Sequence, residues 1–552
     1  MIEIIIENKN SSIQIPQGTN LQKIVELSGY NSPYPPLGAL VNNKLKELSY
    51  KVFEPFKIKY IDISDTNGRR LYIRSLAFVL YKALKDTYPQ SQLKIEHSVS
   101  KGLYCEIDGL NGRMTENVVN KLRKRMKEII AEDIPFIREK VLTQYAIDEF
   151  NKAGLNEKAL LFKTRKRIFT SIYKLDTYIN YFFGYLVPST AYLKLFDIVK
   201  YHEGILICIP SKKNPDKLQE VKFQYKLFKI FREHKTWIKI LNVPYVGNLN
   251  EYISQNKISE FIHISEALHE KKIASIADTI YKKKHDVKVI LISGPSSSGK
   301  TTFSKRLSIQ LRVLGLKTFE LSLDDFFLNR DMTPRDEKGD YNFETIDAID
   351  ISLFNNCLNE LMNGNSVMLP KYDFNIGEKV FSKESTKLQD NTVIIVEGIH
   401  GLNPKLTEGI KEKNKYKVFV SALTQISIDA QNPIPCTDNR LIRRIVRDFQ
   451  FRGYSALDTL KRWPSVKHGE EKYIFPFQEN ADVMFNSALL YELAVLKNLA
   501  EPVLREVPET FEEYAEIIRL LKFLSYFLPC KTNDIPPTSI LREFLGGSSF
   551  KY

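Results

Sequence analysis

The stretch SGPSSSGKTTFSKRL, Ser293–Leu307, has the form of a loop that holds the phosphates of a nucleotide. It follows the apolar run VKVILIS (Val287–Ser293), which is typical of a buried strand, and it leads into apolar residues at helical spacing that end at Gly315. Residues Gly294 to Thr301 fit the pattern GxxxxGK[ST] in full. An ordinary glycine turn is the plain alternative, but the order of strand, glycine loop and helix favours a nucleotide site.

The residue types of this loop suit phosphate binding. Gly294 and Gly299 allow backbone conformations that turn several N–H groups towards one anion at the N-terminus of a helix. Lys300 is placed to reach the β- and γ-phosphates, and the Thr301 hydroxyl is a ligand for Mg²⁺. The residues expected to bind the nucleotide are Gly294, Pro295, Ser296, Ser297, Ser298, Gly299, Lys300, Thr301 and Thr302.

The composition is that of a soluble globular protein, with 43% apolar and 26% charged residues in a chain of 552 that is too long for one core. We expect a cytoplasmic protein without a membrane partner. No window offers the roughly 18 uninterrupted apolar residues that a membrane span needs. The N-terminus carries Glu3 and Glu7 where a signal peptide would be positive. The five cysteines are scattered without a CxxC pair, so neither a zinc site nor a disulfide framework is indicated.

A net charge of +14 indicates an anionic partner. Nucleotide substrates and a lysine-rich composition account for it in one interpretation, and a surface that faces RNA accounts for it in another. The densest basic clusters are KLRKRMK (Lys121–Lys127) and KTRKR (Lys163–Arg167), both outside the nucleotide loop. Basic runs on helices are commonly solvated faces. The sequence leaves RNA contact through the N-terminal half open, and also self-association into a homo-oligomer.

The spacing of apolar residues divides the chain into five segments. Residues 1–62 combine short strands with one helix and fit a β-grasp fold, while 68–240 mix helices with a hairpin in an α+β pattern. Residues 249–284 form a helical connector. From 287 to 495 strands alternate with helices, which predicts an α/β domain with a parallel sheet around the phosphate loop. Residues 500–552 are expected to be a helical appendage that packs on this domain.

Two later strands of the α/β segment end in acidic residues. KTFELSLDDFF (Lys317–Phe327) contains Asp324 and Asp325, and NTVIIVEGIHG (Asn391–Gly401) contains Glu397. Catalytic groups in such sheets gather at the carboxyl ends of strands. One acid there can deprotonate an acceptor hydroxyl and another can hold Mg²⁺, although each alone could cap a helix. A GTPase would need an NKxD motif downstream, and none occurs after position 300.

An arginine-rich helix follows, NRLIRRIVRDFQFRG (Asn439–Gly453). Arg440, Arg443, Arg444 and Arg447 are three to four residues apart and share about one helical face. A solvated helix is one interpretation. We favour a lid that neutralises charge on a transferring phosphoryl group, whereas a remodelling ATPase would supply such arginines from a neighbouring subunit.

From about 287 to 490 the chain resembles the uridine kinase and phosphoribulokinase group of small-molecule kinases. The resemblance rests on GPSSSGKTT, SLDDFF, YNFETIDAID, LPKYDF, VIIVEGI, RRIVRDFQFRG and ENADVMFN, in family order. It implies a P-loop kinase that transfers phosphoryl from ATP, with Mg²⁺, to a hydroxyl of a nucleoside or similar small acceptor. Asp324 would be the base, and Thr301 with Glu397 would serve Mg²⁺.

The same resemblance assigns the remaining roles by position. Lys300, Arg447 and Arg452 would stabilise the phosphoryl group during transfer. Glu344 takes the place of an aspartate that contacts the ribose hydroxyls. The other residues on the acceptor side would be Phe327, Tyr372 and Phe374 in its pocket and Arg444 at its sugar.

Three departures from the family pattern leave the identity of the acceptor molecule open. A uridine–cytidine kinase would carry a histidine three residues after its YDF motif, where this chain has Gly377. Phe327 replaces a tyrosine, and Tyr454 replaces a lid arginine. Phosphoryl transfer is unaffected, but the acceptor could be another metabolite, as in phosphoribulokinase or pantothenate kinase. The remaining alternative is a nucleotide switch associated with RNA or the ribosome.

The front of the chain resembles part of a different enzyme. Residues 1–62 are similar to the TGS domain that opens threonyl-tRNA synthetases, and 68–240 to their editing domain, most closely in SLAFVLYKALKDTYPQSQLKIEHSVSKGLYCEI. The paired histidines of the editing domain would fall at Arg74 and Phe78, so hydrolytic editing is not expected. TGS, editing-like and kinase-like segments together resemble a fused nucleoside-kinase family, in which the front could bind RNA, sense a ligand or serve assembly.

Overall fold

The computed structural model of the chain describes residues 1–110, 112–336 and 339–552. The N-terminal unit is a β-grasp arrangement, in which a mixed sheet of order β2-β1-β7-β4-β5 packs on one helix. Asn20 caps that helix through its side chain, and Gly29 ends it with φ +57°. The elements are β1 (Ile2–Ile6), β2 (Ser11–Ile15), α1 (Leu21–Ser28), β4 (Gly38–Val41), β5 (Lys44–Lys46) and β7 (Phe56–Ile61), with β3 (Thr19–Asn20) paired to β6 (Lys51–Val52).

The second unit has two antiparallel sheets, of order β13-β14-β9-β8 and β10-β11-β12. Its long helix α2 (Thr66–Thr87) packs on α3 (Glu116–Ala131) through a buried apolar face. Four strands form the first sheet, β8 (Gln92–Val99), β9 (Gly102–Asp108), β13 (Asp197–Tyr201) and β14 (Gly204–Cys208). The second sheet and its helices are β10 (Phe136–Leu142), α4 (Thr143–Lys152), α5 (Asn156–Arg165), β11 (Phe169–Leu175) and β12 (Tyr178–Asn180).

Three helices lead from this unit to the kinase-like part, α6 (Tyr225–Leu241), α7 (Val246–Ser254) and α8 (Ile258–Tyr281). A five-stranded sheet of order β16-β19-β15-β20-β23 follows, and every pair in it is parallel. This confirms the α/β class. The apolar run of β15 is buried because helices cover both faces of a parallel sheet. The strands are β15 (Val289–Ser293), β16 (Lys317–Ser322), β19 (Thr392–Glu397), β20 (Lys415–Ser421) and β23 (Val483–Asn486).

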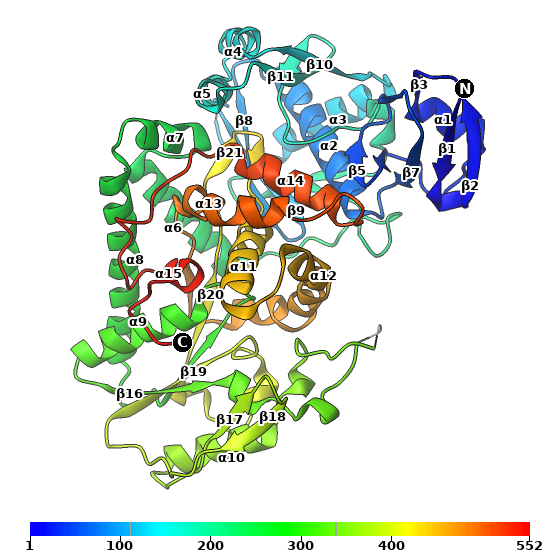
Figure 1. Cartoon of the computed structure of the whole chain (residues 1–552). Coiled ribbons are helices and arrows are strands. Elements are labelled where there is room, and N and C mark those ends of the chain that lie inside the picture. The colour runs from blue at the N-terminus through cyan, green and yellow to red at the C-terminus, as the bar shows by residue number, and fades with distance from the viewer. Residues whose placement is uncertain (111, 337–338) are drawn as a thin grey trace.

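The helices of this part are α9 (Lys300–Val313), α10 (Ile351–Met362), α11 (Cys436–Arg452), α12 (Ala456–Tyr473) and α13 (Glu492–Arg505). Two hairpins complete it, β17 (Pro370–Asp373) with β18 (Glu378–Phe381), and β21 (Ser427–Asp429) with β22 (Asn432–Pro433). Figure 1 shows the β-grasp unit at one end of the molecule and β16 with α10 at the other. Among the described residues, no helix is long and apolar enough to cross a membrane.

The hairpin β21–β22 inserts into the second unit. The Ile95 N–H donates to Ala430 O at 2.8 Å, and Gln431 Nε2 donates to Leu93 O at 2.7 Å. At its tip Asp429 pairs with Lys158 of α5, and both side chains are fully buried. The front half is therefore packed against the kinase-like part as one continuous core.

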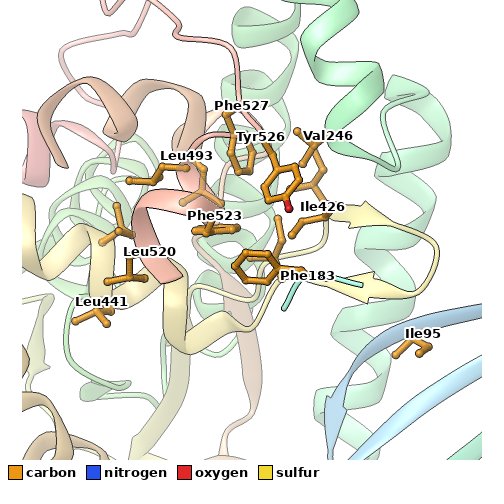
Figure 2. Packing of buried hydrophobic residues seen from close by; sticks show 14 of the residues in the cluster. Ile95, Phe183, Val246, Ile426, Leu441, Leu493, Leu520, Phe523, Tyr526 and Phe527 are labelled. Atoms are coloured by element: carbon orange, nitrogen blue, oxygen red, sulfur yellow. The ribbon is translucent and has the colours of Figure 1, made fainter. Parts of the chain in front are cut away.

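The C-terminal segment differs from the helical appendage that the sequence predicts. Helix α14 (Tyr514–Leu524) forms, but beyond it only α15 (Arg542–Leu545) is α-helical. Pro529, Pro536 and Pro537 lie in the intervening stretch, and proline both lacks an N–H and disfavours helix before it. Helix α14 packs on both halves of the molecule, and Figure 2 shows Leu520, Phe523, Tyr526 and Phe527 among residues from each.

Candidate active site

The phosphate loop joins the end of β15 to the start of α9. Two of its residues have a positive φ, +58° at Ser297 and +80° at Gly299, in the left-handed region that favours glycine. A Cβ at Gly294 would lie 1.9 Å from Val420 O, so only glycine fits against β20. Pro295 O accepts a hydrogen bond from Lys300 Nζ at 3.4 Å, and the hydroxyls of Ser297 and Ser298 are buried without a partner in the described structure.

Glu397 stands at the carboxyl end of β19, facing the first turn of α9. Its Oε2 accepts a hydrogen bond from Thr301 Oγ1 at 3.3 Å, and its Oε1 lies 3.8 Å from Lys300 Nζ. Burial raises the pKa of Glu397 to about 7, the positive charge of Lys300 opposes this shift, and Asp324 adds to it. A carboxylate and a hydroxyl at this spacing are hard oxygen donors that suit Mg²⁺, which is usually held by one or two protein oxygens together with phosphates and water.

Asp324 and Asp325 lie in a short 3₁₀ turn, Leu323–Phe326, that follows β16. Asp325 Oδ1 accepts a hydrogen bond from the Tyr372 N–H at 3.3 Å and so fixes the hairpin β17–β18. Desolvation in the cleft raises the pKa of Asp324, while the charges of Lys300, Arg452 and Arg447 oppose the shift. The two adjacent acids therefore have different surroundings, since Asp325 is bonded to the hairpin and Asp324 is under the influence of the charges of Lys300, Arg447 and Arg452.

Three arginines of α11 converge on one buried carboxylate, Asp448. Arg447 donates to Asp448 Oδ1 from Nε at 3.0 Å and from Nη2 at 2.8 Å, and Arg452 Nε lies 3.7 Å from the same atom. Arg444 donates from Nε to Asp448 Oδ2 at 3.2 Å and from Nη1 to Ser296 Oγ at 2.9 Å. Asp448 thus gathers the three guanidinium groups, of which Arg444 bonds to the loop while the charges of Arg447 and Arg452 act on Asp324.

Arg440 and Arg443 do not belong to this group, contrary to the expectation that four arginines share a lid face. Both are buried beneath the phosphate loop, where Arg440 pairs with Glu470 of α12 and Arg443 with Glu492 of α13. Arg440 Nη1 donates to Ser296 O at 3.1 Å, and Arg443 Nη1 to Ser297 O at 3.4 Å. The two arginines, fixed by these ion pairs, hold the Ser296 and Ser297 carbonyl groups of the loop in place.

The acceptor side is lined by aromatic rings and one acid. The rings of Phe327, Tyr372 and Phe374 lie within 6.3 Å of one another between centroids. Phe327 and Tyr372 are buried, whereas the Phe374 ring is 56% exposed and borders solvent. Glu344 keeps a buried Oε2 without a hydrogen-bond partner in the described structure, and burial followed by the charge of Glu470 raises its pKa to about 7. This oxygen is available to an acceptor hydroxyl.

Gly377 packs against a side chain that the sequence did not single out. It has φ +79°, and a Cβ there would lie 2.7 Å from Arg330 Nε. Arg330 also donates from Nη2 to Phe374 O at 2.7 Å, while its N–H donates to Gly377 O at 2.8 Å. A histidine at position 377 would require a strained backbone and displacement of Arg330. The Arg330 side chain therefore occupies the space that a side chain at position 377 would need.

The C-terminal tail reaches the phosphate loop, which no motif predicts. Thr302 Oγ1 donates to Glu543 Oε2 at 2.8 Å, and the Thr302 N–H to the same oxygen at 3.4 Å. The Tyr552 hydroxyl lies 2.9 Å from Thr302 Oγ1. Ile540 would lie 2.5 Å from a Cβ at Gly299, so the tail covers the start of α9.

The sequence did not single out Asp448, Glu470 and Glu543 near the loop, or Arg330 beside the hairpin β17–β18. Glu470 Oε1 accepts a hydrogen bond from the Ser296 N–H at 3.0 Å, across 174 residues of chain. Acids within helices carry no local signal of such long-range contacts. Asp448 is the exception among them, because it lies one to four residues from Arg447, Arg444 and Arg452 in the arginine-rich helix. This spacing could have indicated that it pairs with them.

Comparison with known proteins agrees with this geometry. Residues 289–492 match the phosphoribulokinase / uridine kinase family. The chain is 30% identical over 197 residues to uridine-cytidine kinase B of Dictyostelium discoideum, covering 36% of this chain and 73% of that protein. D-glycerate 3-kinase from Cryptococcus neoformans aligns with 38% of this chain and 89% of its own, at 16% identity and a TM-score of 0.29.

The N-terminal half is similar to a second class of protein. It is 28% identical over 193 residues to threonine–tRNA ligase of Aquifex aeolicus, which covers 34% of this chain and 30% of the ligase. The chain thus spans less than a third of the length of that ligase. Through the segment that carries the phosphate loop, Asp324 and the arginine helix, the chain belongs to the phosphoribulokinase / uridine kinase family.

Proposed function

We propose that this protein transfers the γ-phosphoryl group of ATP to a hydroxyl of a nucleoside or a similar sugar-bearing small molecule. The observation that carries the proposal is the placement of Asp324, a strand-end acid on which the charges of Lys300, Arg447 and Arg452 act. Its neighbour Asp325 bonds to the Tyr372 N–H, and Glu397 bonds to the Thr301 hydroxyl. A base beside phosphate-binding cations is what phosphoryl transfer to an alcohol requires.

The reaction would proceed without a covalent enzyme intermediate. The acceptor oxygen forms a bond to the γ-phosphorus as the bond from that phosphorus to the bridging oxygen of ADP breaks, and the hydroxyl proton passes to Asp324. Lys300, Arg447 and Arg452 provide positive charge around the transferring group. Mg²⁺ would be held by Thr301 Oγ1 and Glu397 Oε2, which lie 3.3 Å apart, and would neutralise phosphate charge.

The acceptor would lie between Asp324 and the rings of Phe327 and Tyr372. Glu344 offers its unpartnered Oε2 to sugar hydroxyls, as the sequence comparison implies. Arg444 is held near the loop by Ser296 and Asp448 and can reach the same sugar. This arrangement supports an acceptor with several hydroxyl groups.

A second candidate is an acceptor with an anionic group, as in kinases for phosphorylated sugars or carboxylate metabolites. It is favoured by Arg330, which fills the space beside Gly377 and has no carboxylate within ion-pair distance among residues 1–110, 112–336 and 339–552. Arginine binds carboxylate and phosphate groups with a planar pair of donors.

The test is an assay of the full chain with ATP, Mg²⁺ and a panel of acceptors. The panel contains the four ribonucleosides, ribulose 5-phosphate, pantothenate and D-glycerate, and the readouts are acceptor-stimulated ADP release and product mass. Turnover with a nucleoside supports the first candidate, and turnover restricted to anionic acceptors that is lost in Arg330→Met supports the second. ATP turnover that no acceptor stimulates would contradict both.

A further inference from the structure

Basic side chains gather where the second unit meets the C-terminal segment, away from the phosphate loop. The guanidinium carbon of Arg74 in α2 lies 5.9 Å from the centre of the Phe183 ring, and Lys522 Nζ in α14 lies 5.5 Å from the same ring. Arg165, the last residue of α5, lies 4.3 Å from the Tyr526 ring. Figure 2 shows the Phe183 and Tyr526 rings close together, and their centroids are 5.7 Å apart.

These three cations lack a carboxylate partner among the described residues, unlike the cations around them. Arg70, Arg138 and Arg519 form ion pairs with Glu516, Glu47 and Asp438. Within the part of the chain that the structure describes, no carboxylate lies within 4 Å of Arg74, Arg165 or Lys522. Arg74 donates only a long bond of 3.5 Å to Tyr185 O, and the buried Nε of Arg165 has no hydrogen-bond partner.

The electrostatic surroundings of Lys522 and Arg74 are unfavourable to their charge. Burial, followed by the positive charges of Arg165, Arg74, Arg138 and Arg167, lowers the pKa of Lys522 to about 7. Burial and the charges of Arg70 and Arg519 lower the pKa of Arg74 to about 9, against small opposing effects of Tyr173 and Asp438. Repulsion of this kind is relieved when a negative charge enters among the cations.

Packing alone does not account for the cluster. Cation–π contacts with Phe183 and Tyr526 stabilise each charge by only about 0.5–1 kcal/mol when it is partly exposed. A methionine or leucine would cover the same rings without repulsion between charges. Groups whose charge is disfavoured by their surroundings, and which gather at one place in the fold, are typical of binding sites.

We propose that Arg74, Arg165 and Lys522 form a binding site for a small phosphorylated molecule, separate from the kinase site. Their side chains are half-buried, at a junction between two segments of the chain, and the Phe183 ring beneath Arg74 and Lys522 is buried. Half-buried donors at such a junction suit a compact anion better than the flat, exposed surface that a nucleic acid backbone contacts. Two planar guanidinium groups and one ammonium group offer donors for several phosphate oxygens.

Two residues of the site, Arg74 and Arg165, belong to the editing-like unit. Arg74 stands where the sequence comparison places the first histidine of the editing pair, so the residue that would serve hydrolysis is replaced by a phosphate-binding type. Lys522 comes from the C-terminal segment that the synthetase-like unit does not include. The ligand would therefore contact both halves of the molecule.

Binding is tested with tripolyphosphate by calorimetry at pH 8 and constant ionic strength. All proteins carry Lys300→Ala, which weakens phosphate binding at the loop, so that the calorimeter measures binding at the second site. Adding Lys522→Met or Arg74→Met should weaken binding by roughly tenfold or more, the value of a lost charge-assisted hydrogen bond. Adding Lys531→Met, an exposed lysine of the same segment, should leave binding unchanged.

Two further measurements separate binding from folding and from RNA. Lys522→Met should not lower the melting temperature, because it removes an unpaired cation. At pH 8 tripolyphosphate binding should take up a proton at Lys522, so the heat should differ between Tris and HEPES buffers for the parent but not for Lys522→Met. The proposal is overturned if tripolyphosphate does not bind, if Lys522→Met and Arg74→Met bind it as the parent does, or if only an RNA oligonucleotide without a terminal phosphate binds through Lys522.

Discussion

Glu543 Oε2 accepts hydrogen bonds from the hydroxyl and the backbone N–H of Thr302, at 2.8 and 3.4 Å. Thr302 lies in the first turn of α9, and the N-terminus of a helix after a glycine loop favours one anion. The Glu543 carboxylate and a nucleotide phosphate would use the same donors. The tail therefore competes with the nucleotide for the start of α9.

Replacing Glu543 by glutamine should strengthen nucleotide binding. The substitution keeps the size of the side chain and removes the charge, so the repulsion of about 1 kcal/mol between carboxylate and phosphate disappears and the Kd for ATP should fall by roughly fivefold. The measurement is fluorescence titration with a labelled ATP analogue. Glu506→Gln, at an exposed position before α14, is the control. Weaker binding in Glu543→Gln would show instead that the tail helps to hold the nucleotide.

Replacing Asp324 by asparagine should abolish most turnover without a comparable loss of nucleotide affinity. The amide cannot accept the acceptor proton, and loss of a general base costs about 10²–10⁴ in kcat. Asp325→Asn is the matched control, because Asp325 holds the Tyr372 N–H and should affect acceptor KM more than kcat. Steady-state kinetics with the best acceptor of the panel measure both values. Equal losses of kcat in the two variants would contradict the separation of their roles.

The sequence predicts the parts of the site that are local in the chain. Strand, glycine loop and helix around Lys300 follow from a continuous motif, and Asp324 and Glu397 follow from the rule that strand ends meet at one edge of a parallel sheet. Helical spacing also places the α11 arginines on neighbouring positions. It does not show that Arg440 and Arg443 point down to Glu470 and Glu492.

The residues that the sequence did not predict are distant from the loop in the chain and reach it only in the folded structure. Glu543 is 241 residues from Thr302, and Glu470 is 174 residues from Ser296. Each is an acid within a helix, with no spacing that distinguishes it from a solvated one. The sequence predicts a helical appendage for residues 500–552, but the prolines between Leu524 and Arg542 leave an irregular path of turns to the loop.

Replacing Lys158 by methionine should destabilise the junction of the two halves. Lys158 and Asp429 are fully buried, so the substitution leaves a buried carboxylate without its cation, and the expected loss is about 3–5 kcal/mol. Chemical denaturation of the full chain measures this loss. The double variant Lys158→Met/Asp429→Leu should recover much of it, because it removes both charges. Full stability of Lys158→Met alone would show that the hairpin β21–β22 does not depend on this pair.

Glu344 and Glu397 keep their protons in the folded chain and should each lower its stability as the pH rises from about 4.5 to 7. The buried His97, His234 and His400, whose pKa values are lowered by burial, contribute in the opposite direction. The pKa of Glu344 is raised from 4.5 to about 7 by burial and the charge of Glu470, and Glu397 behaves similarly. Between these pH values the two carboxyl groups bind more protons in the folded state than in the unfolded state, so each group lowers the free energy of unfolding, by at most about 3 kcal/mol. Glu344→Gln mimics the protonated acid and should roughly halve the decrease due to the two carboxyl groups, leaving the part due to Glu397. Glu408→Gln, at an exposed position, should leave the profile unchanged. Denaturation midpoints from pH 4.5 to 8 test this, and an unchanged slope in Glu344→Gln would show that Glu344 is already ionised in the folded protein.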